Sequence, residues 1–142
     1  MTSTWETNVD AILTALVDQL KTVTELSNRV YSTFDYAISS YPTVLIQFLR
    51  DRLSRRNNVV FHNLFFNVAL FCRKGESESS EDFHASLLWS IGLLSDEIEG
   101  FDDPIAVWES IAVESIESGV PAQGESFIFV RTDFIVRITK RW

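Results

Sequence analysis

Hydrophobic residues recur at intervals of three and four positions in two stretches of the chain, and each stretch predicts an amphipathic helix. The first begins with a capping-box pattern at Ser3-Thr4-Trp5-Glu6 and extends to about residue 24. The second begins after Ser79 or Ser80, either of which can cap it, and ends at Gly100. The expected buried faces are Val9, Ile12, Leu13, Leu16, Val17, Leu20 and Val23 in the first helix and Phe83, Leu87, Leu88, Ile91, Leu94 and Ile98 in the second.

Apolar residues at every second position predict strands in the rest of the chain. A short extended segment at 29–34 precedes Tyr41-Pro42, where the proline biases the residue before it toward extended backbone. Strands are expected at 43–49, 58–72, 107–116 and 128–138. The order is therefore helix, strands, helix, strands, without an internal repeat. We expect one α+β domain spanning residues 1–142, with two helices packed on one face of an antiparallel or mixed β-sheet.

The two longest predicted strands have a second face that is only partly polar. One face of the 58–72 strand carries Leu64, Phe66, Val68 and Leu70, whereas the opposite face mixes aromatic rings with polar groups. A single copy that showed these rings to water would present a large apolar patch, which usually marks a partner site. We therefore expect contacts with other chains through Phe61, Phe65, Phe71, Phe127, Phe129, Arg131 and Arg137.

Charge is distributed unevenly along the chain, whose formal net charge is −8. The segment 75–130 holds thirteen carboxylates and neither lysine nor arginine, so all twelve basic residues lie outside it. Oppositely charged regions on one molecule favour association with complementary surfaces on other molecules. The charge pattern therefore predicts assembly.

Four arginines, Arg50, Arg52, Arg55 and Arg56, lie in the segment 50–58, which we expect to be a long basic hairpin connection between two strands. Such a cluster can dock onto an acidic protein surface, remain solvated, or contact the phosphates of a nucleic acid. The negative net charge and the lack of glycine or aromatic residues within the cluster argue against a dedicated DNA-binding domain. Docking onto an acidic protein surface is the preferred interpretation, and a solvated segment is the next.

Residue patterns for catalysis or for ligand binding are not visible. His62 and His84 have no second histidine or cysteine at metal-ligand spacing, and the five glycines form no phosphate-binding fingerprint. The single cysteine, Cys72, cannot form an internal disulfide and is expected to be buried. The longest apolar run, residues 64–72, is about half of what a membrane helix needs. We expect no enzyme activity, no metal or other cofactor, and no membrane partner.

The arrangement resembles the tail terminator (tail-completion, or neck) proteins of long-tailed bacteriophages. The likeness lies in the opening helix from Val9 to Val23, in Arg29-Val30-Tyr31 and in Tyr41-Pro42-Thr43-Val44-Leu45-Ile46 entering a strand. It continues in the long strand through Leu70, in the helix from Phe83 to Ile98, and in the two closing strands that end in Phe134-Ile135-Val136-Arg137-Ile138. It covers nearly the whole chain and rests on the order and length of the elements. The arginine segment departs from it by being unusually basic.

The resemblance implies a structural protein of the virion, located in the tail at the head-tail neck and assembled in the host cytoplasm. Such a protein forms a ring, commonly a hexamer, at the head-proximal end of the tail tube, where it ends tube polymerisation and joins the tail to the head connector. Its partners would be other copies of itself, the tail tube protein and a connector or neck protein. DNA would pass through without specific binding, and we expect acids facing the lumen, with candidates Asp96, Glu97, Glu99, Asp102 and Asp103.

Two other classes of function compete with this one. A different ring component of the neck or baseplate would share the same features. A small-ligand-binding α+β regulatory domain would instead need a pocket with a few convergent polar groups.

Overall fold

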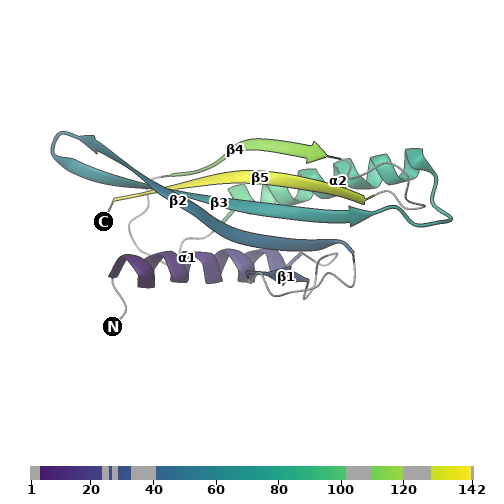
Figure 1. Ribbon diagram of the computed structural model, residues 1–142, viewed down its shortest axis with the longest axis horizontal. Coiled ribbons are helices and arrows are strands. Elements are labelled where there is room, and N and C mark those ends of the chain that lie inside the picture. The colour runs from purple at the N-terminus through teal and green to yellow at the C-terminus, as the bar shows by residue number, and fades with distance from the viewer. Residues whose placement is uncertain are drawn as a thin grey trace.

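A five-stranded sheet and two helices make up the part of the chain that the computed structural model describes, residues 4–23, 26, 29–32, 41–101, 110–119 and 129–141. The sheet order is β1-β2-β3-β5-β4, with β1 parallel to β2 and all other neighbours antiparallel (Figure 1). This confirms the α+β class with a mixed sheet. The elements are α1 Thr4–Lys21, β1 Val30–Tyr31, β2 Thr43–Arg56, β3 Val59–Arg73, α2 Ser80–Glu99, β4 Ser110–Gly119 and β5 Phe129–Lys140.

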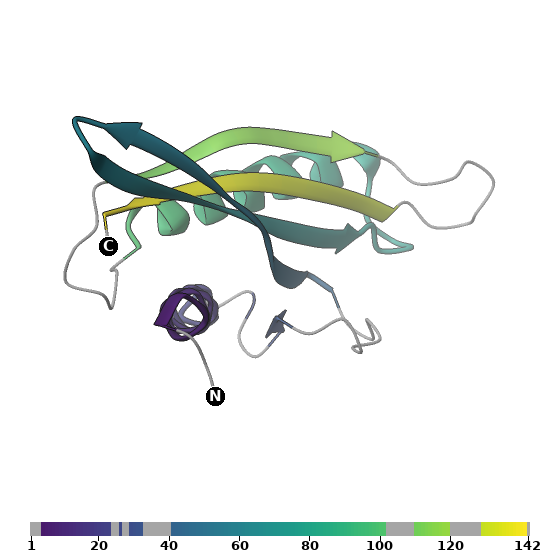
Figure 2. The ribbon, with the colours of Figure 1, turned by 60° about the vertical axis from the view of Figure 1, so that its left-hand side comes forward.

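One face of the sheet forms the core with both helices. The fully buried residues of the central strands alternate, with Leu64, Phe66 and Val68 on β3 opposite Ile138, Val136 and Phe134 on β5. They belong to the same hydrophobic cluster as the inner residues of α1 and α2. Burial of each such side chain contributes about 1.5–3 kcal/mol before ordering entropy is subtracted. In Figure 2, α1 is seen nearly end-on and α2 lies behind the sheet.

Both ends of α2 follow the predicted capping residues. The Ser79 hydroxyl accepts a hydrogen bond from the Asp82 amide at 3.1 Å, and the Gly100 amide donates to the Asp96 carbonyl at 3.0 Å. The expected inner face is buried or partly buried except at Leu88, which was predicted wrongly. The buried face of α2 is formed by Phe83, Leu87, Leu94 and Ile98, and it is too narrow to include Leu88.

The arginine segment is not a loop, which corrects the prediction for residues 50–58. Strand β2 continues through Arg56 and pairs with β3 up to the Arg56–Val59 pair. Only Asn57 and Asn58 form the turn, with φ angles of 51° and 66°. Positive φ at both central positions is characteristic of a type I′ turn, whose twist matches that of the flanking strands. Asparagine tolerates this left-handed backbone better than most residues, so the pair of asparagines is the local sequence signal for the turn.

We expect replacement of Asn58 by Ala to lower the free energy of unfolding by about 1 kcal/mol, because alanine is strained in the left-handed backbone conformation of this position. Replacement by Gly should leave stability unchanged or raise it slightly. Urea unfolding followed by tryptophan fluorescence measures both values. Equal stability of the Ala and Gly variants would contradict this account of the turn.

Candidate interaction surface

The face of the sheet opposite the helices, called the open face below, carries phenylalanine rings that are covered by arginines. The guanidinium carbon of Arg50 lies 4.5 Å from the centre of the Phe65 ring, and that of Arg131 lies 5.4 Å from the Phe71 ring. Each exposed pair of this kind is worth about 0.5–1 kcal/mol. The rings are half-buried within one chain, so much of the apolar area expected to face water is already covered. Two further pairs are Arg73 over Phe129 at 5.5 Å and Arg56 over Phe61 at 5.9 Å.

A β-bulge in β2 places the arginines on this face. Phe48 pairs with Phe66 and Arg50 with Phe65, so Leu49 is an extra residue that reverses the alternation of the strand. Before the bulge the even-numbered residues of β2 face the helices. After it, Arg50, Arg52 and Arg56 point to the open face, whereas Asp51 and Arg55 point to the helix side. Sequence alternation alone does not reveal this reversal.

Two of the predicted interface arginines have carboxylate partners within the chain. Arg131 Nε lies 2.9 Å from Asp133 Oδ1, and Arg137 Nε lies 2.8 Å from Glu114 Oε1. Both pairs are partly exposed and contribute at most about 1 kcal/mol each. Among the described residues, the four arginines of β2 form no ion pair. Two of them, Arg50 and Arg56, lie over phenylalanine rings instead.

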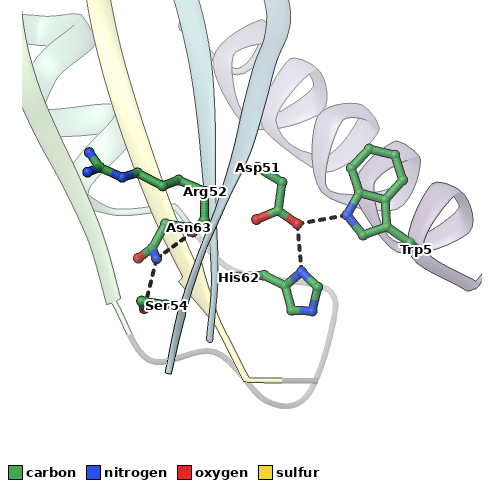
Figure 3. Close-up of polar contacts among 6 residues, drawn as sticks. All are labelled: Trp5, Asp51, Arg52, Ser54, His62 and Asn63. Carbon is green, nitrogen blue, oxygen red and sulfur yellow. Dashed lines mark hydrogen bonds and ion pairs between the residues drawn. The ribbon is translucent and has the colours of Figure 1, made fainter. Parts of the chain in front are cut away.

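The two-stranded arm formed by β2 and β3 is attached to α1 through one carboxylate (Figure 3). The Trp5 indole donates to Asp51 Oδ2 at 2.8 Å, and His62 Nδ1 lies 2.6 Å from the same oxygen. On the other side of the strand, the Asn63 carboxamide donates to the Arg52 carbonyl at 2.7 Å. The Trp5 contact joins the arm to α1, and the other two contacts join the two strands of the arm to each other. No sequence pattern indicates the link between Trp5 and Asp51, which are 46 residues apart in the chain.

The predicted lumen acids that the structure describes do not all lie on one surface. Asp96 and Glu99 are exposed on α2, whereas Glu97 accepts a hydrogen bond from the Gln19 side chain at 2.7 Å and so faces α1. Asp102, Asp103 and the predicted interface residue Phe127 lie outside the described residues. A lumen position for any of these acids stays a prediction.

The outer side of α2 also exposes two large apolar residues. Leu88 and Trp89 are each 55% exposed, and α2 itself contains no lysine or arginine. An apolar patch flanked by acids is unusual for a helix face turned to solvent.

Two shallow depressions lie beside Tyr41 and Cys72, one between β3 and β5 and the other between the end of β3 and α2, where Trp89 lines it. Their volumes are about 250 Å³ and 190 Å³, below the usual range of small-molecule sites, and the larger one is almost entirely apolar. This favours a contact surface over a regulatory ligand pocket. Among the described residues, no cluster of three or more His, Cys, Asp or Glu side chains could hold a metal ion. Neither described helix has the length and apolar character needed to span a membrane.

Comparison with solved structures shows a close likeness in fold. The chain matches one chain of a structure titled "Virion of native gene transfer agent (GTA) particle" with a TM-score of 0.64 and 11% sequence identity. The match covers 95% of this chain and 98% of the other. No protein-family model matches the sequence, and no curated protein matches it. The likeness therefore concerns the fold, and it extends over both chains almost from end to end.

Cys72 lies between these depressions and the core, and its burial raises the pKa of the thiol from its ordinary value of 9.0 to about 11. Because the thiolate is the reactive form, native protein at pH 8 should react with Ellman's reagent far more slowly than unfolded protein. The raised pKa also means that stability from this burial is present below pH 9 and lost as the pH rises toward 11. A Cys72→Val variant should lose that part of the alkaline decline, and fast labelling of native protein would contradict the assignment.

Proposed function

We propose that this chain is a structural virion protein that forms a ring at the head-proximal end of a phage tail tube. There it ends tube polymerisation and joins the tail to the head connector. The observation that carries the proposal is the fold match to a chain of a gene transfer agent virion, which spans nearly the full length of both chains. The sequence resemblance to tail terminator proteins, drawn from element order alone, points in the same direction.

The charge distribution supports assembly into a closed ring. A ring requires two unlike surfaces on each subunit, because each copy meets one neighbour on each side. The arginine-bearing open face and the acidic outer side of α2 are two such surfaces. The partners in this role are further copies of the chain, the tail tube protein and the connector. DNA passes through the ring without specific contacts.

We expect the purified protein to form a ring of about six subunits, visible in negative-stain images and measurable by light scattering after gel filtration. Replacing Arg50, Arg52, Arg55 and Arg56 together with Ser should prevent ring formation or docking to the tube, because these arginines have no ion pair among the described residues. Lys21→Ser on the exposed end of α1 is the matched control and should assemble normally. Unchanged assembly of the fourfold variant would refute a role for the arginines.

Incubation with preformed tail tubes separates this proposal from another ring component of the neck or baseplate. A terminator should bind one end of the tube and stop further growth when tube protein is added. A ring that leaves tube growth unchanged would refute the terminator role while leaving a structural virion role in place.

A further inference from the structure

The solvent side of α2 has the pattern of a contact surface. Glu81, Ala85, Leu88, Gly92, Asp96 and Glu99 recur at intervals of three and four and are all exposed, which defines the outer stripe of α2. The middle of the stripe is apolar or small and both of its ends are acidic. Trp89, also exposed, flanks the middle.

Gly92 gives this stripe a second distinctive feature. A methyl group at this position would meet no heavy atom within 4 Å, so nothing in the described chain requires a glycine here. Glycine in a helix interior is less favourable than alanine. Its usual advantage is that it lets another surface approach the backbone closely. The neighbouring Leu88 and Trp89 would then border a shallow notch in an otherwise apolar patch.

The open face has the complementary properties. Among the described residues its charged groups include six arginines and three carboxylates, and half-buried phenylalanine rings lie between them. A surface of phenylalanine rings and arginines is complementary, in polarity and in charge, to an apolar patch with acidic ends. The carboxylates can approach the guanidinium groups while the apolar middle of the stripe contacts the rings.

Within one chain these two surfaces cannot meet. The inner side of α2 packs on the sheet face that forms the core, so the outer stripe and the open face point away from each other on opposite sides of the molecule. They can meet only between two copies. Because the two surfaces differ, each contact leaves one of each kind free for the next copy, and the series can close into a ring.

We propose that the outer stripe of α2 in one copy packs against the open face of the next copy, with Asp96 and Glu99 facing arginines such as Arg50 and Arg52. The proposal rests on the ring of the proposed function and names the surfaces that build it. Asp96 and Glu99 then face a neighbouring subunit, not the lumen. A nucleic acid on the open face would satisfy the arginines but would leave the outer stripe of α2 uncovered, so a second copy is the favoured occupant.

Charge reversal tests the contact directly. The first variant carries Asp96→Lys and Glu99→Lys, which also suits the carboxyl end of a helix and should not harm folding. The second carries Arg50→Glu and Arg52→Glu. Each variant alone should remain monomeric, because its two surfaces have the same sign. Mixed in equal amounts, they should recover the ring of the native protein, since alternating copies pair opposite charges at every contact.

A substitution at Gly92 tests the apolar part of the same contact. Gly92→Trp should fold, because the chain leaves space there, and should fail to assemble. Thr14→Trp, on the exposed side of α1, is the control and should assemble like the native protein. Circular dichroism and thermal unfolding verify that every variant is folded, and light scattering after gel filtration gives its mass.

The outcomes separate this contact from the function on which it rests. Native rings, together with reversed variants that assemble alone or do not recover on mixing, would overturn the contact and leave the proposed function standing. A native protein that stays monomeric at every concentration would overturn both. The variant with Arg50→Glu and Arg52→Glu is also tested for binding to a labelled DNA duplex. If this variant still forms rings but no longer binds the duplex that the native protein binds, the open face binds nucleic acid and the proposed contact is overturned.

Discussion

The two-residue alternation of β3 and β5 is the constraint on which the rest of the structure depends. Leu64, Phe66 and Val68 face the helices and are fully buried, and a shift of one position would turn all of them to the opposite face. Both described helices pack against this one surface, so neither of them covers the other face of the sheet. The chain covers part of it instead with arginine side chains laid over phenylalanine rings, such as Arg50 over Phe65. This cover leaves the face charged and still partly apolar.

The bulge at Leu49 determines what the arm can contact. If β2 alternated regularly through Leu49, Arg50 would point toward α1 and Asp51 would point away from it. With it, Asp51 reaches Trp5 and His62 and ties the arm to the helix, while alternate arginines join the open face. The bulge therefore produces both the contact between the arm and α1 and the arginines on the open face. The arm is an ordered continuation of the sheet. A solvated loop would have needed neither feature.

Periodic features were predictable from the sequence and irregular ones were not. The helices, the sheet class, the capping residues Ser79 and Gly100 and the burial of Cys72 follow from spacing and local chemistry, and the structure confirms them. Only residues 50–58 of the arm were predicted as a loop, because arginines break the apolar spacing there and the asparagine pair at 57 and 58 is a local signal for the turn, not a periodic one. The exposure of Leu88 was missed because a helical repeat cannot say how wide the buried face is. The partners of Asp51 were out of reach because they depend on tertiary contacts.

The separation of charge along the sequence becomes a separation in space only because of the fold. The acidic segment contributes α2, whose outer stripe points to solvent, and the basic segment contributes Arg50, Arg52 and Arg56, which lie on the opposite face of the sheet. An isolated copy therefore holds two complementary surfaces that it cannot bring together. Screening by salt limits their attraction to about 8 Å at physiological ionic strength, so long-range attraction alone would not hold copies in place. In the proposed contact, the apolar middle of α2 packs against the aromatic rings and supplies the short-range attraction that holds the copies together. The charges determine which surfaces meet.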